Sequence, residues 1–239
     1  SGLPYSITLL TILLFHEFGH YFAAKHFGVR ATLPYFIPIP VPPIGTMGAV
    51  IKTRSKIPHR KALFYIGTMG PIPGFIISLA AVIIGIYLSE VGPLPKGDGT
   101  IPIFGDSLLF TFFVKVFHGN IPPGHDIFLS PYAWAGWVGF LITSLNLIPI
   151  GQLDGGHILY SLIGEKQKYV GWASVLGLVI LSFMFQGWIL WIVITFALLM
   201  VGHPQIEEGP ELTISEKIIG WSCMLILLLT FVPVPVKFI

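Results

Sequence analysis

Charged residues are scarce in this 239-residue chain. Asp, Glu, Lys and Arg together make up 10% of it, whereas soluble domains carry about 25%. The hydrophobic share is 54% and the mean hydropathy is +0.84. This balance excludes an ordinary soluble domain and predicts a polytopic protein of the lipid bilayer. The net charge of +2 is too small for a nucleic-acid-binding surface, so we expect no nucleic-acid partner.

Cysteine is almost absent as well. Cys223 is the single cysteine, which excludes an intrachain disulfide, and the apolar stretch around it favours a packing role over a nucleophilic one. The first fifteen residues lack the basic start and the small-residue cleavage site of a secretory signal peptide. Repeats of fixed period are missing too, and the sequence carries no signal for an oligomeric state.

Long apolar stretches predict an all-α membrane protein with about six transmembrane helices. We expect them at residues 3–25, 62–89, 131–163, 169–185, 187–201 and 217–233. The third stretch is too long for one simple span, and Pro149, Gly151, Gly155 and Gly156 are expected to break it.

Two connections between these stretches are unusual. Residues 33–53 contain too many prolines for a helix, so they predict a small membrane-embedded β-hairpin or re-entrant segment. Such a backbone is tolerated at membrane depth only where protein or a water-filled cavity covers it. The second connection, residues 90–130, is a longer loop, in which residues 106–117 predict a short helix at the membrane interface.

Basic residues gather between the first two apolar stretches. The positive-inside rule therefore predicts that the loop of residues 25–61 is cytoplasmic. Its basic residues are Lys25, Arg30, Lys52, Arg54, Lys56, Arg60 and Lys61.

The most informative run lies inside the first apolar stretch and reads His16-Glu17-Phe18-Gly19-His20. On a helix His16 and His20 project from one face, one turn apart, a spacing that lets two imidazoles share a zinc ion. Glu17 can then act as the general base on a zinc-activated water. The alternative is a chance pattern in a helix, but two histidines and a glutamate at membrane depth need partners or a function.

A third zinc ligand is needed, because catalytic zinc commonly has three protein ligands and one open position. Asp154 is the outstanding candidate, since it is the only acidic residue between Asp126 and Glu165. The alternative for Asp154 is a helix cap at the break of the third stretch. His157 is an alternative ligand, but its position nearer the predicted cytoplasmic end favours a bond to backbone or water.

These two regions together resemble the paired signature of the site-2 protease family of intramembrane zinc metalloproteases. The second part of the signature is Asn146…Pro149…Leu153-Asp154-Gly155. The run Gly67–Gly74 resembles the small-residue motif of the family's next helix, and Gly45–Gly48 resembles the glycine-containing loop before it. Order and spacing agree over about residues 10–160.

The chain departs from many members of that family in two places. The connection 90–130 is too short for the additional peptide-binding, PDZ-like domain that many relatives carry there, so the chain resembles a compact form. Gly74 stands where family members often have asparagine. The glycine form also fits the family's pattern, so this departure does not predict a loss of activity.

The resemblance implies a role for each matching residue. One Zn²⁺ would be bound by His16, His20 and Asp154, with Glu17 as general base and then general acid. Asn146 would lie near the metal and hold the substrate backbone or the oxyanion. The alternative for Asn146 is a hydrogen bond between helices.

The resemblance also implies a strand that receives the substrate. In the segment 45–50, Gly48, Ala49 and Val50 would pair with an unwound stretch of substrate. A helical substrate hides its peptide bonds, and an edge strand offers replacement hydrogen-bond partners by strand addition. The alternative for Gly45 and Gly48 is turn chemistry after the prolines.

The implied activity is that of a zinc-dependent intramembrane endopeptidase. It would cleave single-span transmembrane proteins, with its active site toward the cytoplasmic side. The implied organisation is one membrane protease domain over residues 1–239, with a catalytic core at about 3–163 and C-terminal helices at about 169–233.

Three rival functions remain at this point. A zinc transporter or channel would spread polar residues along a path, but the other histidines, apart from His157, fall in predicted loops. A catalytically silent binding protein of the same fold would not need Glu17. A membrane zinc protease that clips lipid-modified tails would lack the arrangement of Asn146 and Asp154.

Overall fold

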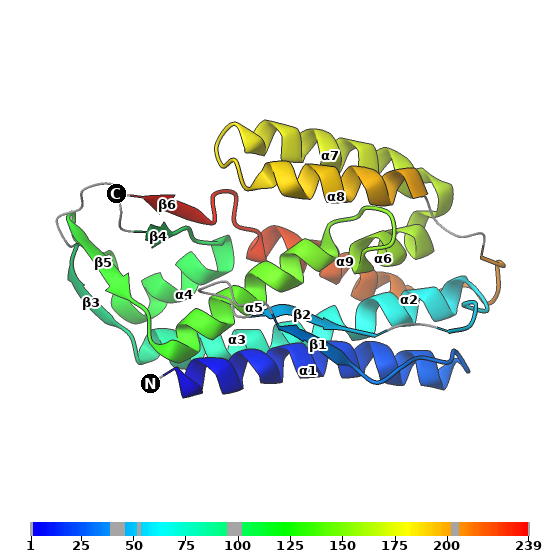
Figure 1. Ribbon diagram of the computed structural model, residues 1–239, viewed down its shortest axis with the longest axis horizontal. Coiled ribbons are helices and arrows are strands. Elements are labelled where there is room, and N and C mark those ends of the chain that lie inside the picture. Colours follow the sequence, from blue (N-terminus) through cyan, green and yellow to red (C-terminus); the bar gives the residue numbers. More distant parts are fainter. Residues whose placement is uncertain (1, 39–45, 52–53, 95–101, 202–205, 239) are drawn as a thin grey trace.

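A computed structural model describes residues 2–38, 46–51, 54–94, 102–201 and 206–238. The fold is mainly helical, and the long helices run roughly along the longest axis of the molecule (Figure 1). The helices are α1 (Leu3–His26), α2 (Arg60–Met69), α3 (Pro71–Tyr87), α4 (Leu108–His118), α5 (Pro131–Leu147), α6 (Asp154–Ile163), α7 (Gln167–Ser182), α8 (Trp188–Val201) and α9 (Ile214–Thr230). A short 3₁₀ turn, Gly164–Lys166, joins α6 to α7.

Two helical segments in the described part of the chain are long and apolar enough to cross a membrane. They are Leu3–His26 and Arg60–Tyr87, with 24 and 28 residues. The second corresponds to the predicted helix 62–89, but it divides at Gly70 into α2 and α3. Pro71 begins the new helix because it has no backbone N–H to continue the hydrogen bonds of α2. The helices α5 and α7–α9 have 14 to 17 residues, fewer than the ~20 that span a bilayer alone. The count of six therefore stays a prediction.

The break in the third apolar stretch is present in the structure. Helix α5 ends at Leu147 and α6 begins at Asp154, and Gly151 between them adopts a positive φ of 50°. Glycine suits this left-handed backbone because it has no Cβ. The break brings the start of α6 close to the end of α5, where a Cβ at Gly155 would overlap the carbonyl oxygen of Leu147.

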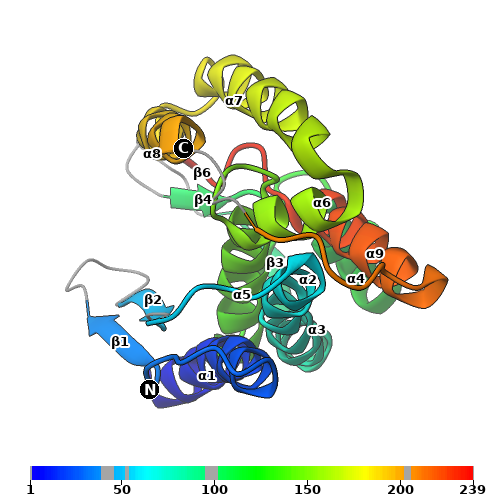
Figure 2. The same ribbon diagram turned by 90° about the vertical axis from the view of Figure 1, so that its right-hand side faces the viewer.

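Among the residues described, three short antiparallel strand pairs accompany the helices. The pair β1 (Tyr35–Pro38) and β2 (Thr46–Val50) falls in the proline-rich segment, with Ala49 opposite Phe36 and Val50 opposite Tyr35. Figure 2 shows this pair beside α1, on the outside of the helical core. The residues that join β1 to β2, including Gly45, lie outside the described part. The other two pairs join β3 (Glu90–Pro93) to β5 (His125–Phe128), and β4 (Pro102–Phe104) to β6 (Val236–Phe238).

The strands β3 to β6 were not expected from the sequence, which predicted a loop with one short helix over residues 90–130. The short helix is present as α4. The strands were not predicted because each has only three or four residues, and β4 pairs with β6 at the other end of the chain. Such distant pairing leaves no local pattern in the sequence.

The main core lies where α3 packs on α5 and both pack on α1. Fully buried side chains such as Leu13, Val82, Val138 and Phe140 fill this space. The outward faces of the helices are also apolar, with large exposed side chains along α1, α7, α8 and α9. Such extensive apolar exposure is abnormal in water and is expected of a surface that faces lipid.

Candidate metal centre

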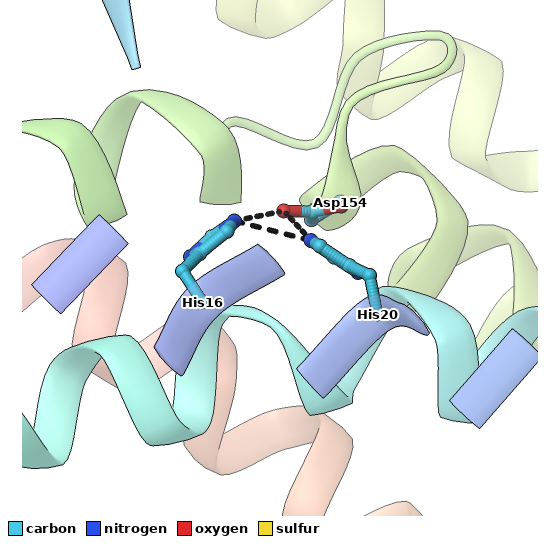
Figure 3. Close-up of side chains that lie close together, drawn as sticks. All are labelled: His16, His20 and Asp154. Atoms are coloured by element: carbon cyan, nitrogen blue, oxygen red, sulfur yellow. Dashed lines mark hydrogen bonds and ion pairs between the residues drawn. The ribbon is translucent and has the colours of Figure 1, made fainter. Parts of the chain in front are cut away.

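Two buried histidines project from one face of α1. His16 and His20 are 4% and 6% exposed, and their Nε2 atoms lie 3.1 Å apart. The helix is continuous through both residues, so their four-residue spacing brings the imidazoles to the same side, as the sequence predicted. Figure 3 shows both rings turned toward Asp154 of α6.

Asp154 supplies the third side chain from the other half of the signature. Its Oδ2 lies 3.4 Å from His16 Nε2 and 3.3 Å from His20 Nε2. The residue at the N-cap of α6 is Leu153, and no side chain caps this helix. Asp154 is therefore not the helix cap that the sequence left open. Its carboxylate points instead at the two imidazoles.

The donor atoms of these three residues fit a zinc ion. A zinc ion with ligand bonds of about 2.0–2.1 Å in tetrahedral geometry separates its ligand atoms by about 3.3 Å. The three distances here, 3.1, 3.3 and 3.4 Å, match the edges of such a tetrahedron. Among the described residues these three form a group that could hold a metal ion, and His157 is not part of it.

A main-chain contact fixes the orientation of His20. Its Nδ1 donates a hydrogen bond to the carbonyl oxygen of Ile66 in α2, at 2.6 Å. Because Nδ1 carries the proton, the lone pair of Nε2 is left facing the metal centre. No sequence signal pointed to Ile66, since a backbone carbonyl carries no residue-specific pattern.

Two glycines of the α2–α3 segment let this segment approach the histidines. A Cβ atom at Gly70 would overlap the imidazole of His20, and one at Gly74 would lie 3.1 Å from His16 Nδ1. Both positions therefore favour a residue without a side chain, because the imidazoles occupy the space. This packing gives a physical reason for glycine at position 74, where the resemblance expects asparagine in many proteins.

Glu17 is buried beside the metal centre, with 8% exposure. Its carboxylate accepts a hydrogen bond from the backbone N–H of Ile51, the residue that follows β2. The strand that the sequence singled out for substrate binding thus ends next to the proposed general base. Asn146, near the end of α5, lies with Nδ2 3.3 Å from His16 Nε2.

The segment of Gly48, Ala49 and Val50 forms the last part of β2. Strand β2 pairs with β1 in a two-stranded sheet, so its second edge has no strand partner in the described part of the chain. An edge of this kind presents unpaired backbone N–H and C=O groups. This is the property that strand addition by a substrate requires.

The fold and this site together define a class: a helical membrane protein with a buried metal centre. Residues 4–185 match the sequence model of "Peptidase family M50". The chain therefore belongs to peptidase family M50, the site-2 protease family, and the resemblance found in the signature residues is confirmed. Members of this family are membrane-embedded zinc metalloproteases, and the three donor atoms fit the zinc ion that this implies.

Curated relatives carry matching names. The chain is 29% identical to the "Probable zinc metalloprotease EGY2, chloroplastic" of Arabidopsis thaliana over 252 residues, which cover 100% of this chain and 43% of the relative. It is 32% identical to the "Probable zinc metalloprotease EGY1, chloroplastic" of Oryza sativa subsp. japonica over 172 residues, covering 71% of this chain and 29% of the relative. The chain thus spans less than half the length of these relatives.

Proposed function

We propose that this chain is the catalytic domain of an intramembrane zinc endopeptidase that cleaves single-span transmembrane proteins. The observation that carries the proposal is the convergence of His16, His20 and Asp154 on one point, with Glu17 buried beside them. When bound, the zinc ion supplies Lewis-acid activation of a water molecule and of the scissile carbonyl group. Family membership and the names of the relatives support protease chemistry at this point.

Each residue of the site has a distinct task in this proposal. His16, His20 and Asp154 hold the ion, and Glu17 accepts a proton from the attacking water and delivers it to the leaving amine. The side-chain amide of Asn146 donates a hydrogen bond to the oxygen of the reacting carbonyl. The hydrogen bond from Ile51 keeps the Glu17 carboxylate oriented, because its position within the helix alone would leave the side chain free to rotate.

The edge of β2 explains how a helical substrate becomes accessible. A transmembrane helix satisfies its own backbone groups, and unwinding it in lipid leaves each freed group without a partner. Gly48, Ala49 and Val50 offer backbone partners along the edge that β1 does not use. Because β2 leads directly to Ile51 and Glu17, a paired substrate strand would be led to the metal centre.

We also propose how the chain is oriented in the membrane. The basic loop of residues 25–61 follows the end of α1 that lies beyond His20, so the site faces the side of this loop. By the positive-inside rule this is the cytoplasmic side of a cell membrane. A zinc transport path would need further polar groups spaced along the membrane-spanning helices. The described helices present one three-residue metal-binding group.

The test is a cleavage assay with the purified chain and a model transmembrane substrate, with zinc measured in the same samples. Glu17→Gln is expected to keep one zinc per chain and to lose about 10²–10⁴-fold in kcat, because the proton acceptor is gone. Asn146→Ala is expected to keep zinc and to lose about 10²-fold. The matched control is Glu165→Gln, which changes an exposed glutamate in the 3₁₀ turn between α6 and α7 and should behave as wild type. Full activity in Glu17→Gln would refute the assignment of the base.

A further inference from the structure

A cavity of about 620 Å³ lies at the C-terminal end of α1, away from the metal centre. Its walls come from the last turns of α1, the chain that leaves it, and the segment before α2. Three cationic side chains line it: Lys25, Arg30 and Arg54. Neither the proposed chemistry nor the family signature makes use of these residues.

The cationic side chains are held near one another by the backbone. The N–H of Arg54 donates to the carbonyl of Arg30 at 2.7 Å, and the N–H of Arg30 donates to Ser55 Oγ at 2.9 Å. Residues 30–31 and 54–55 therefore run side by side, which places two arginines on neighbouring segments. Like charges on neighbouring segments create a positive potential that attracts anions. An anion bound between these side chains would neutralise their charges.

The neighbouring sequence does not supply such an anion. The sequence contains no Asp or Glu between residues 18 and 89. In the part of the chain that the structure describes, Lys25, Arg30 and Arg54 form no ion pair with a carboxylate. The cavity thus combines exposed positive charge with a space large enough for a small polar group.

The position of the cavity indicates where the anion comes from. Helix α1 has 24 residues, which corresponds to about 36 Å at 1.5 Å per residue, whereas the hydrocarbon core of a bilayer is about 30 Å thick. A helix of this length extends beyond the core, and the charge of Lys25 in the last turn favours placing this end at the level of the lipid headgroups. Leu33 and Tyr35 also line the cavity and are 62% and 58% exposed, so its rim is apolar as well as charged.

We propose that this cavity binds the phosphate headgroup of an anionic phospholipid. Arg30 and Arg54 contact the phosphate oxygens, Lys25 adds a third positive charge, and Leu33 and Tyr35 pack against the first carbons of the lipid chains. Basic pockets at membrane surfaces recognise acidic headgroups in this way, and guanidinium groups match the geometry of phosphate. The inference rests on the membrane location of the chain and is independent of its proposed protease chemistry.

The experiment measures lipid retention by the purified full chain in a neutral detergent, using native mass spectrometry. The probes are phosphatidylglycerol and phosphatidylcholine with identical acyl chains. Arg30→Gln/Arg54→Gln is expected to bind phosphatidylglycerol about thirtyfold more weakly than wild type, since each basic residue near an anionic surface contributes about 1 kcal/mol. Arg30→Lys/Arg54→Lys keeps the charge and is expected to retain most of the binding.

The matched control is Lys166→Gln/Lys168→Gln, which removes the same charge from exposed positions outside the cavity. Equal binding of the two lipids by wild type, or an equal loss in the lysine control, would overturn the proposal. Displacement of the lipid by glycerol 3-phosphate at equal concentration would assign the cavity to a soluble phosphate ester instead. Displacement by an acidic peptide would assign it to a protein segment. Zinc content, measured in every variant, reports that the fold is intact.

Discussion

Around His16 and His20 the packing is so close that the imidazoles leave little or no room for a Cβ at the glycines of the α2–α3 segment. The α7–α8 hairpin, in contrast, turns most of its large side chains outward. In the described residues, the hairpin packs against Ile148 and Ile150 through Val175, Leu198 and Leu199, and two hydrogen bonds add to this contact. Gln167 Nε2 donates to the carbonyl of Pro149, and Trp188 Nε1 donates to the carbonyl of Pro233. In Figure 2 the hairpin stands at the side of the molecule opposite α1.

The two regions differ in how precisely their side chains must be placed. A metal centre tolerates little displacement, so its ligands are fixed by main-chain contacts and by neighbours that leave no free space. A pair of helices that faces lipid needs only an apolar surface, and many side chains satisfy that condition. Substitutions should therefore have large effects in the first region and small effects in the second.

The largest effect is expected for Gly70→Ala. The new Cβ would overlap the ring of His20, so we expect zinc affinity to fall by at least tenfold and activity by about 10²-fold or more. The matched control is Gly177→Ala in α7, where an added Cβ meets no atom within 4 Å. The control should keep zinc and gain about 0.5–1 kcal/mol of stability, because alanine favours a helix more than glycine does. Zinc titration and the cleavage assay check both variants. Normal zinc affinity in Gly70→Ala would show that close packing around His20 is not needed for zinc binding.

A second contrast removes a large side chain from each region. Phe140 of α5 is 1% exposed and stacks on Phe75 with ring centroids 5.8 Å apart. Phe140→Ala is expected to lower the free energy of unfolding by ~3–5 kcal/mol through the cavity it leaves. Ile180→Ala in α7 removes a side chain that is 60% exposed and should change stability by less than about 0.5 kcal/mol. Thermal unfolding in detergent measures both, and similar shifts in the two variants would contradict the distinction.

A smaller effect is expected where α9 meets α2. The buried carboxylate of Glu216 accepts hydrogen bonds from Lys61 Nζ at 2.9 Å and from the Tyr65 hydroxyl at 2.6 Å, and it also takes part in the capping box with Thr213. Glu216→Gln leaves Lys61 without its counter-ion and should destabilise the protein by about 1–3 kcal/mol. The exposed Glu211 provides the control, Glu211→Gln, for which we expect no measurable shift in Tm. A Glu216→Gln variant as stable as wild type would show that this contact does not contribute to the stability of the fold.

The sequence indicated the site better than its surroundings. The spacing of His16, Glu17 and His20 is a local property of one helix, and the scarcity of carboxylates singled out Asp154 at a distance of more than a hundred residues. The function of Asn146 came from the resemblance alone. The structure brings all five together, and their chemical roles stay proposals.

What the sequence could not indicate are contacts made through the backbone. The carbonyl of Ile66 and the N–H of Ile51 orient His20 and Glu17, and every residue type carries such groups. The short strands β3 to β6 escaped for a related reason, because their pairing depends on partners far along the chain. The division of the second span at Gly70 was also missed, although Pro71 is a local signal for it.

We propose that one zinc site is assembled from α1 and α6. The most direct measurement is zinc affinity and zinc-edge X-ray absorption on wild type, on Asp154→Ala, and on Asp126→Ala in β5 as a control. The account predicts one zinc per wild-type chain with two nitrogen ligands and a carboxylate oxygen, an unchanged site in the control, and an affinity at least about 10²-fold lower in Asp154→Ala. Stoichiometric zinc with unchanged affinity and absorption in Asp154→Ala would contradict it.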